Sequence, residues 1–214
     1  MKSKIELKPN QTIVFIGDSI TDAERMSAAY KPFGAGYVHF TANALLAKYP
    51  QLNLNIINSG VSGNTVRNMR DRWEKDCIDL KPDILSVMIG VNDLWRQYGS
   101  PADLPAAVYV DEYEATYRQL LLEAKQKTHC KMILMEPYMF CDDPCNAMFM
   151  QLRVYIAIVH KLVEEFDAVL VPVQKYVDKI IGKVESKRWS EDMIHPYMWA
   201  HCWISQRWLE ATSL

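Results

Sequence analysis

A serine near the start of the chain and an aspartate and a histidine near its end could together carry out acyl transfer. Ser19 closely follows the apolar run 13–16, a pattern typical of a buried strand that delivers a side chain to its carboxyl end. Asp192 and His195 lie three residues apart, just before Pro196. A serine hydroxyl becomes an effective nucleophile when an imidazole accepts its proton and a carboxylate orients that imidazole. These residues predict a Ser-His-Asp triad, with helix N-capping as the alternative role for Ser19.

A glycine and an asparagine could complete such a site by stabilising negative charge. The tetrahedral intermediate of acyl transfer carries a developing oxyanion, which needs preorganised hydrogen-bond donors. The backbone N–H groups of Ser19 and Gly63 and the side-chain amide of Asn92 could converge to supply them, and a glycine at 63 allows close approach of the backbone. Gly63 and Asn92 are also ordinary turn residues, so this prediction depends on the whole set.

Alternating strands and helices are needed to bring these residues to one edge of a sheet. We expect strands at 13–16, 53–58, 84–89, 131–136 and 168–171. We expect helices at 38–48, 65–73, 111–127, 146–166, 175–181 and 196–210. This alternation predicts right-handed crossovers and a parallel sheet covered by helices on both faces. We expect one α/β domain over residues 1–214.

Composition excludes several classes of partner. The net charge is -2, and charged residues of both signs are interspersed, so we expect no nucleic acid and no anionic membrane surface as a partner. No apolar stretch approaches the roughly 18 residues of a membrane span, and the basic N-terminus lacks the apolar run of a signal peptide. We therefore expect a cytoplasmic protein without membrane association.

Cysteines indicate reduced thiols and no metal site. The chain has five, an odd number, scattered along the sequence, which does not favour a disulfide framework. The loop 141–145 combines two cysteines with two aspartates but has no second Cys or His pair nearby, so we predict no metal there and no cofactor elsewhere.

Four short blocks together resemble the SGNH hydrolase superfamily, the GDSL-type esterases. They are Gly-Asp-Ser-Ile at 17–20, Ser-Gly-Asn-Thr at 62–65, Gly-Val-Asn-Asp at 90–93 and Asp-Met-Ile-His-Pro at 192–196. They stand in the family's order at the ends of the expected elements, and the first block has isoleucine where the family's name has leucine. The resemblance implies a three-layer α/β/α, flavodoxin-like fold with five parallel strands.

The same resemblance implies a role for each residue of the site. Ser19 would be the nucleophile, Asp192 and His195 would complete the triad, and Gly63 and Asn92 would join the Ser19 N–H in the oxyanion hole. Asp18 precedes the nucleophile in the motif, and we assign it a structural role in holding the loop.

Further segments look like the bacterial acetyl-xylooligosaccharide esterases within that superfamily. They are 17–22, 36–38, 58–67, 92–98 and 111–116, and the likeness extends over nearly the whole chain. Those enzymes remove acetyl groups from xylose units, work without a metal and tend to form multimers. The resemblance therefore implies an acetylated small sugar as substrate and a homo-oligomer.

Aromatic and basic residues on the expected strand-end loops could bind the sugar. They are Trp95, Arg96, Tyr98, Tyr138 and Trp189. Aromatic faces with flanking donors suit sugar rings, although an aromatic side chain beside a loop can equally close the core, and Arg96 can simply pair with a carboxylate. The alternatives for the activity are a lysophospholipase, a thioesterase or a broad short-chain carboxylesterase. A non-catalytic carbohydrate-binding protein is disfavoured because the complete triad is present.

Overall fold

A parallel five-stranded sheet forms the centre of the protein. The computed structural model describes residues 5–214. Its strands are β1 (Thr12–Gly17), β2 (Asn55–Gly60), β3 (Ile84–Met88), β4 (Lys131–Met135) and β5 (Val169–Val171). They are parallel and lie in the order β2-β1-β3-β4-β5, which is the flavodoxin-like doubly wound order. The predicted fold class is confirmed.

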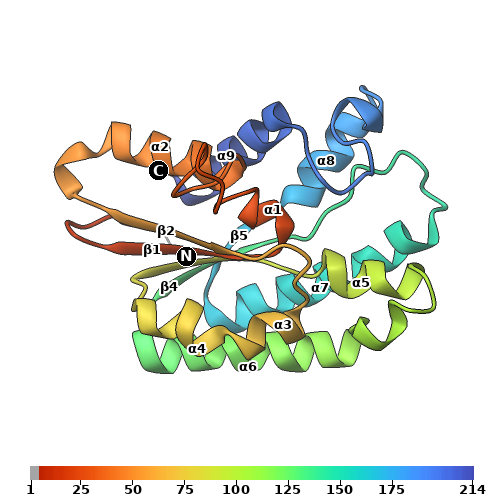
Figure 1. The fold of residues 1–214 in the computed structure, drawn as a ribbon, viewed down its shortest axis with the longest axis horizontal. Coiled ribbons are helices and arrows are strands. Elements are labelled where there is room, and N and C mark those ends of the chain that lie inside the picture. The colour runs from red at the N-terminus through yellow and green to blue at the C-terminus, as the bar shows by residue number, and fades with distance from the viewer. Residues whose placement is uncertain (1–4) are drawn as a thin grey trace.

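Helices cover both faces of this sheet. One layer contains α2 (Tyr37–Lys48), α8 (Val173–Ile181) and α9 (Met198–Thr212). The opposite layer contains α3 (Val66–Asp71), α4 (Trp73–Asp76), α6 (Val110–Thr128) and α7 (Ala147–Phe166), as Figure 1 shows. The short α1 (Ser19–Asp22) and α5 (Val91–Tyr98) begin just after β1 and β3. Single 3₁₀ turns lie at Pro50–Leu52, Ile78–Leu80, Leu104–Ala106 and Ser186–Arg188.

Burial on both faces explains why the strands are apolar without interruption. Residues 13–16 of β1 are fully buried, and all five residues of β3 are buried. Gly17 at the end of β1 pairs with Gly60 of β2, so these two strands reach the same edge of the sheet together. A Cβ atom at Gly17 would lie 2.3 Å from the carbonyl oxygen of Met88, which leaves no room for a side chain there.

The last helix is fixed to the centre of the sheet by a tryptophan. Trp208 is fully buried, its ring lies 5.4 Å from that of Phe15 on β1, and its indole N–H donates to Ser86 Oγ on β3 at 3.0 Å. Thr41 Oγ1 on α2 also donates to Ser205 Oγ on α9 at 2.9 Å. The second half of α9 is thereby held against the sheet and against α2.

Several predicted bounds were wrong, and one helix was missed. β2 covers 55–60, two residues later than predicted, and the predicted helix 65–73 is divided into α3 and α4 at Arg72, whose backbone leaves helical geometry. The predicted start of this helix at Thr65 was correct, since Thr65 is the N-cap of α3. Residues 91–98 form helix α5, where we predicted a loop, because Gly90, at a φ of 132°, begins a helix whose first residues include the turn-forming pair Asn92 and Asp93.

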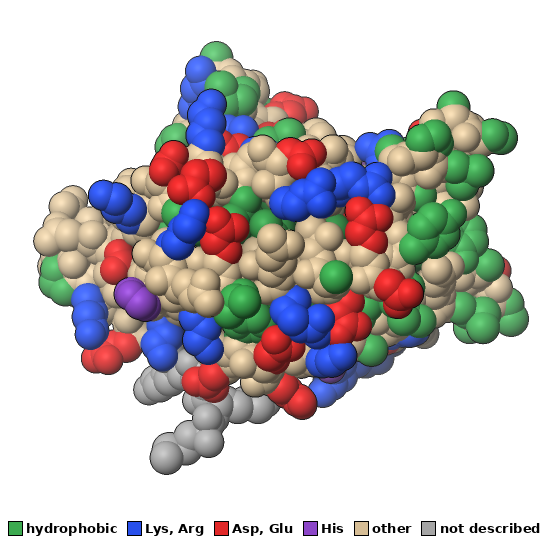
Figure 2. Space-filling view, turned by 90° about the horizontal axis from the view of Figure 1, so that it is seen from below, with side chains coloured by type: hydrophobic (Ala, Val, Ile, Leu, Met, Phe, Trp, Pro, Cys, Tyr) green, Lys and Arg blue, Asp and Glu red, His purple; other side chains and the backbone are tan. Residues whose placement is uncertain are grey.

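The surface of the layer that contains α3, α4, α6 and α7 mixes charges of both signs. Figure 2 shows basic and acidic side chains alternating over this face. Several of them form ion pairs, including Arg67 with Glu112 and Arg118 with Glu114 and Glu165. Among the helices of residues 5–214, none combines the length and the apolar character needed to cross a bilayer.

Candidate active site

Ser19 is the first residue of α1, directly after the end of β1. The N-cap of this helix is Asp18, whose carboxylate accepts the Ile20 N–H at 3.0 Å, so the alternative role of Ser19 as the cap is wrong. Asp18 is only 1% exposed, and burial raises its pKa to about 7 against the opposing effects of the Ile20 N–H and His195. The hydroxyl of Ser19 is left available to other partners.

Ser19, His195 and Asp192 form a continuous chain of hydrogen bonds. Ser19 Oγ lies 2.9 Å from His195 Nε2, and His195 Nδ1 lies 2.6 Å from Asp192 Oδ2. With the Nδ1 proton donated to the carboxylate, Nε2 is free to accept the serine proton. The structure therefore brings the three residues together in the arrangement needed for nucleophilic catalysis.

A tight turn gives Asp192 its reach toward His195. Asp192 Oδ1 accepts the backbone N–H groups of Ile194 and His195 and the hydroxyl of Ser190, at 2.8 to 3.0 Å. Met193 takes a left-handed conformation at a φ of 68°, which completes the turn. Burial raises the pKa of Asp192, but the hydrogen bonds from His195, Ile194 and Ser190 outweigh that effect and lower it to about 2. The carboxylate is therefore ionised at neutral pH.

Gly63 and Asn92 reach the same site from two neighbouring loops. Gly63 lies in residues 61–64, which we call the Gly63 loop, and has a φ of 77°, a conformation that favours glycine. Asn92 Nδ2 donates to the backbone carbonyl of Asn64 at 3.1 Å. Because an amide nitrogen carries two protons, this bond orients the group and leaves one proton for the site.

One cavity of about 470 Å³ connects these residues. Its lining includes Ser19, His195, Gly63 and Asn92, and further Ile20, Ala23, Glu24, Ser62, Trp95, Pro196 and His201. Residues 5–214 contain no group of three His, Cys, Asp or Glu side chains placed to hold a metal ion. The cavity thus combines a nucleophile, a base and candidate oxyanion donors.

Of the five predicted sugar-binding residues, only Trp95 lines the cavity, where its side chain is 46% exposed. Arg96 donates to the Gly63 carbonyl at 2.9 Å, and Tyr98 bonds Ala147 and Gln151 of α7. These three residues lie on α5 and not on a loop, so their predicted placement was wrong.

The other two predicted residues belong to the core. Tyr138 is fully buried and Trp189 is 8% exposed. Both rings pack against Phe140, at 5.2 and 5.8 Å between centroids. The structure does not bring them to the cavity, because aromatic residues at the ends of β4 and before α9 close the gap between those elements.

His201 lines the cavity and was not singled out from the sequence. Its Nδ1 accepts the backbone N–H of Tyr37 at 3.2 Å, which leaves the proton of the neutral ring on Nε2. Burial lowers its pKa to about 4, with a smaller effect of His195, so the ring is neutral at pH 7. Its position in the second turn of α9, six residues after His195, is the only sequence signal that could have indicated it.

Comparison with known proteins gives a consistent picture. Residues 15–199 match the model of the GDSL-like Lipase/Acylhydrolase family. An acetylxylan esterase from Geobacillus stearothermophilus is 35% identical over 209 residues, which are 96% of this chain and 95% of the relative. The crystal structure of the acetylxylan esterase Axe2 from the same organism superimposes with a TM-score of 0.92 at 34% identity, covering 98% of this chain and 97% of the other.

Two further structural comparisons add detail. LAE5, an alpha/beta hydrolase enzyme from the metagenome of Lake Arreo, Spain, matches with a TM-score of 0.88 at 34% identity over 97% of both chains. Solved catalytic mutants of Axe2 replace a serine, a histidine and an aspartate of that enzyme.

The hydrogen bonds of Asp192 predict a large effect of its removal. Asp192→Asn should lower kcat for p-nitrophenyl acetate on the order of 10³-fold to 10⁴-fold, since an amide cannot hold the imidazole in the required tautomer. Because the carboxylate titrates at a pKa of about 2, it stays ionised from about pH 5 to about pH 9, and its own titration should add no step to the parent's pH profile in that range. Glu191→Gln is the control, since that carboxylate only accepts from the Tyr197 hydroxyl. A loss below about 10-fold at about pH 8 would contradict the assignment.

Proposed function

Because the chain belongs to the GDSL-like lipase/acylhydrolase family and is a carboxylic ester hydrolase, we propose that it is a serine esterase that removes O-acetyl groups from small sugars. The observation that carries the proposal is the hydrogen-bonded chain from Ser19 through His195 to Asp192, whose Ser19 and His195 line one cavity with Gly63 and Asn92. Acetylated xylooligosaccharides are the proposed substrates, and the support for them is the relationship to an acetylxylan esterase over almost the whole of both chains.

The first half of the reaction forms an acetyl-enzyme. His195 Nε2 accepts the proton of Ser19 Oγ as the oxygen attacks the acetyl carbonyl carbon. The carbonyl oxygen becomes an oxyanion, which accepts hydrogen bonds from the N–H groups of Ser19 and Gly63 and from the Asn92 amide. The tetrahedral intermediate collapses when the C–O bond to the sugar breaks and His195 donates its proton to the departing sugar oxygen.

The second half of the reaction returns the free enzyme. His195 now accepts a proton from water, and the water oxygen attacks the acetyl carbonyl of the ester on Ser19. The same donors stabilise the second oxyanion, and acetate leaves as the proton returns to Ser19 Oγ. In both halves Asp192, ionised and hydrogen-bonded to Nδ1, stabilises the positive imidazolium.

The cavity is suited to a small acyl group attached to a polar alcohol. Trp95 presents an aromatic surface at its edge, and His201 adds a neutral imidazole to its lining. An aromatic ring beside hydrogen-bonding groups suits a sugar ring, whose faces are apolar and whose edge carries hydroxyls.

A series of substrates tests this proposal. We expect turnover of acetylated xylooligosaccharides, and p-nitrophenyl esters should be hydrolysed less well as the acyl chain lengthens beyond acetyl. Ser19→Ala should abolish both activities. Rising activity toward long acyl chains would favour a lysophospholipase or thioesterase. Full activity of Ser19→Ala, or no turnover by the parent protein, would contradict the serine esterase.

We also propose that the protein forms a homo-oligomer, and that it is cytoplasmic. Large hydrophobic side chains with exposed fractions of 44 to 60% lie on adjoining elements, namely Tyr98, Leu104, Tyr109 and Met150. Figure 2 shows hydrophobic side chains gathered at this end of the molecule. If this surface packed against the same surface of a second copy of the chain, both surfaces would be buried. All five cysteines lie in the described part of the chain as free thiols, which suits a reducing compartment.

Light scattering tests the assembly directly. We expect a mass that is a multiple of one chain for the parent protein and a shift toward the single-chain mass for Tyr109→Asp, because a charge in the interface opposes association. Leu122→Asp is the control, since Leu122 is 46% exposed farther along α6. A single-chain mass for the parent protein would contradict the oligomer.

A further inference from the structure

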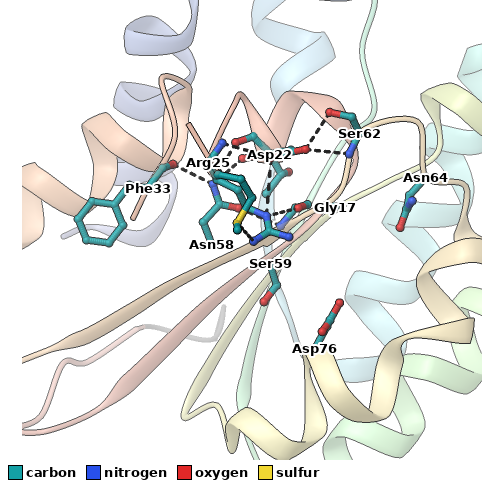
Figure 3. A network of polar contacts seen from close by, with 12 residues as sticks. Gly17, Asp22, Arg25, Phe33, Asn58, Ser59, Ser62, Asn64 and Asp76 are labelled. Carbon is teal, nitrogen blue, oxygen red and sulfur yellow. Dashed lines mark hydrogen bonds and ion pairs between the residues drawn. The ribbon is translucent and has the colours of Figure 1, made fainter. Parts of the chain in front are cut away.

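One arginine joins the Gly63 loop to the ends of both strands that lead into the site. Arg72 Nε donates to Asn64 Oδ1 at 2.7 Å. Its two terminal nitrogens donate to the Ser59 carbonyl on β2 at 2.7 Å and to the Gly17 carbonyl on β1 at 3.0 Å. Figure 3 shows Gly17, Ser59 and Asn64 on three different segments of the chain. A single planar group therefore fixes the relative position of these segments.

The guanidinium has little freedom to take another position. The Arg72 side chain is 15% exposed, and a fourth hydrogen bond leads to Asp76 Oδ2 at 3.1 Å. Four of the five N–H donors of a guanidinium are thus used. A charge removed from water is tolerated only when its donors are paired in good geometry, so losing one contact strains the others.

All three candidate oxyanion donors depend on the atoms that Arg72 binds. Gly17 is two residues before Ser19, and Asn64 directly follows Gly63. The backbone carbonyl of Asn64 in turn accepts the amide of Asn92. Each of the three donors is therefore one or two residues, or one hydrogen bond, away from a contact of this side chain.

Asp22 holds the Gly63 loop from the opposite end. Its Oδ2 accepts the backbone N–H of Ser62 at 3.0 Å and the Ser62 hydroxyl at 2.8 Å. Figure 3 shows Asp22, at the end of α1, facing Ser62. Asp22 thus fixes the residue before Gly63, and Arg72 fixes the residue after it. The direction of the Gly63 N–H is therefore fixed as well.

We propose that Arg72 is a positioning residue that sets the geometry of the oxyanion hole. The inference rests on the proposed esterase function. Arg72 touches neither the substrate nor the nucleophile. It acts by keeping the N–H groups of Ser19 and Gly63 and the amide of Asn92 aimed at one point. Displacement of such donors by about 1 Å costs on the order of 100-fold in rate.

Arg72→Lys tests the proposal because it keeps the charge and loses the planar fork. For p-nitrophenyl acetate we expect kcat to fall by about 10-fold to 100-fold and KM to stay within about three-fold. Affinity for a methyl trifluoromethyl ketone, which forms a tetrahedral oxyanion with the serine, should fall by the same factor as kcat. Arg70→Lys is the matched control, because that exposed arginine of α3 pairs only with Asp71.

Asn64→Ala provides a second route that leaves Arg72 in place. It removes the link between the guanidinium and the Gly63 loop, and we expect the same loss of kcat and of ketone affinity. In the Asn92→Ala background, Arg72→Lys should cost less than in the parent, because the two act on one oxyanion hole.

The outcomes separate this inference from the function it depends on. If the parent turns over, Ser19→Ala is inactive, and folded Arg72→Lys keeps parental kcat and ketone affinity, the inference is wrong and the function stands. If Arg72→Lys does not fold, parental kinetics of Asn64→Ala overturn the inference in the same way. An inactive parent refutes the function first.

Discussion

The hydrogen bond between Ser19 and His195 joins residues 176 positions apart, and the fold holds the two atoms 2.9 Å from each other. Ser19 is placed by β1, the fully buried strand next to the centre of the sheet. His195 lies on the connection into α9, which is fixed to β1 and β3 through Trp208. A shift of α9 along the sheet would therefore move the base away from the nucleophile.

Two aspartates near this bond have opposite electrostatic environments. Asp18 is buried with few partners, so its pKa is raised to about 7, whereas Asp192 accepts hydrogen bonds from three neighbours and its pKa falls to about 2. The two environments therefore give the two carboxyl groups different roles. Asp18 organises the start of α1, and Asp192 stays charged beside the imidazole. Positive charge that develops on His195 is thus balanced from the Asp192 side.

Much of the fold could be predicted from local patterns, since buried parallel strands are continuous apolar runs and each is followed by a helix. The loops that carry Ser19, Gly63 and His195 follow from the same pattern. The final positions of individual side chains did not follow from this pattern. Tyr138 and Trp189 were predicted to bind the substrate but fill the core, and Arg72 contacts Asn64 and Gly17, which are 8 and 55 positions away. Such placements depend on packing between distant segments, and a local sequence pattern carries no information about that packing.

The proposed mechanism depends most on Ser19 as a nucleophile activated by His195. A p-nitrophenyl phosphonate, which phosphonylates an activated serine irreversibly with release of p-nitrophenolate, followed by peptide mapping tests this directly. This mechanism predicts one adduct, on Ser19, at a rate that falls by at least about 100-fold in His195→Ala. An adduct on another residue, or equal rates in the two proteins, would contradict it.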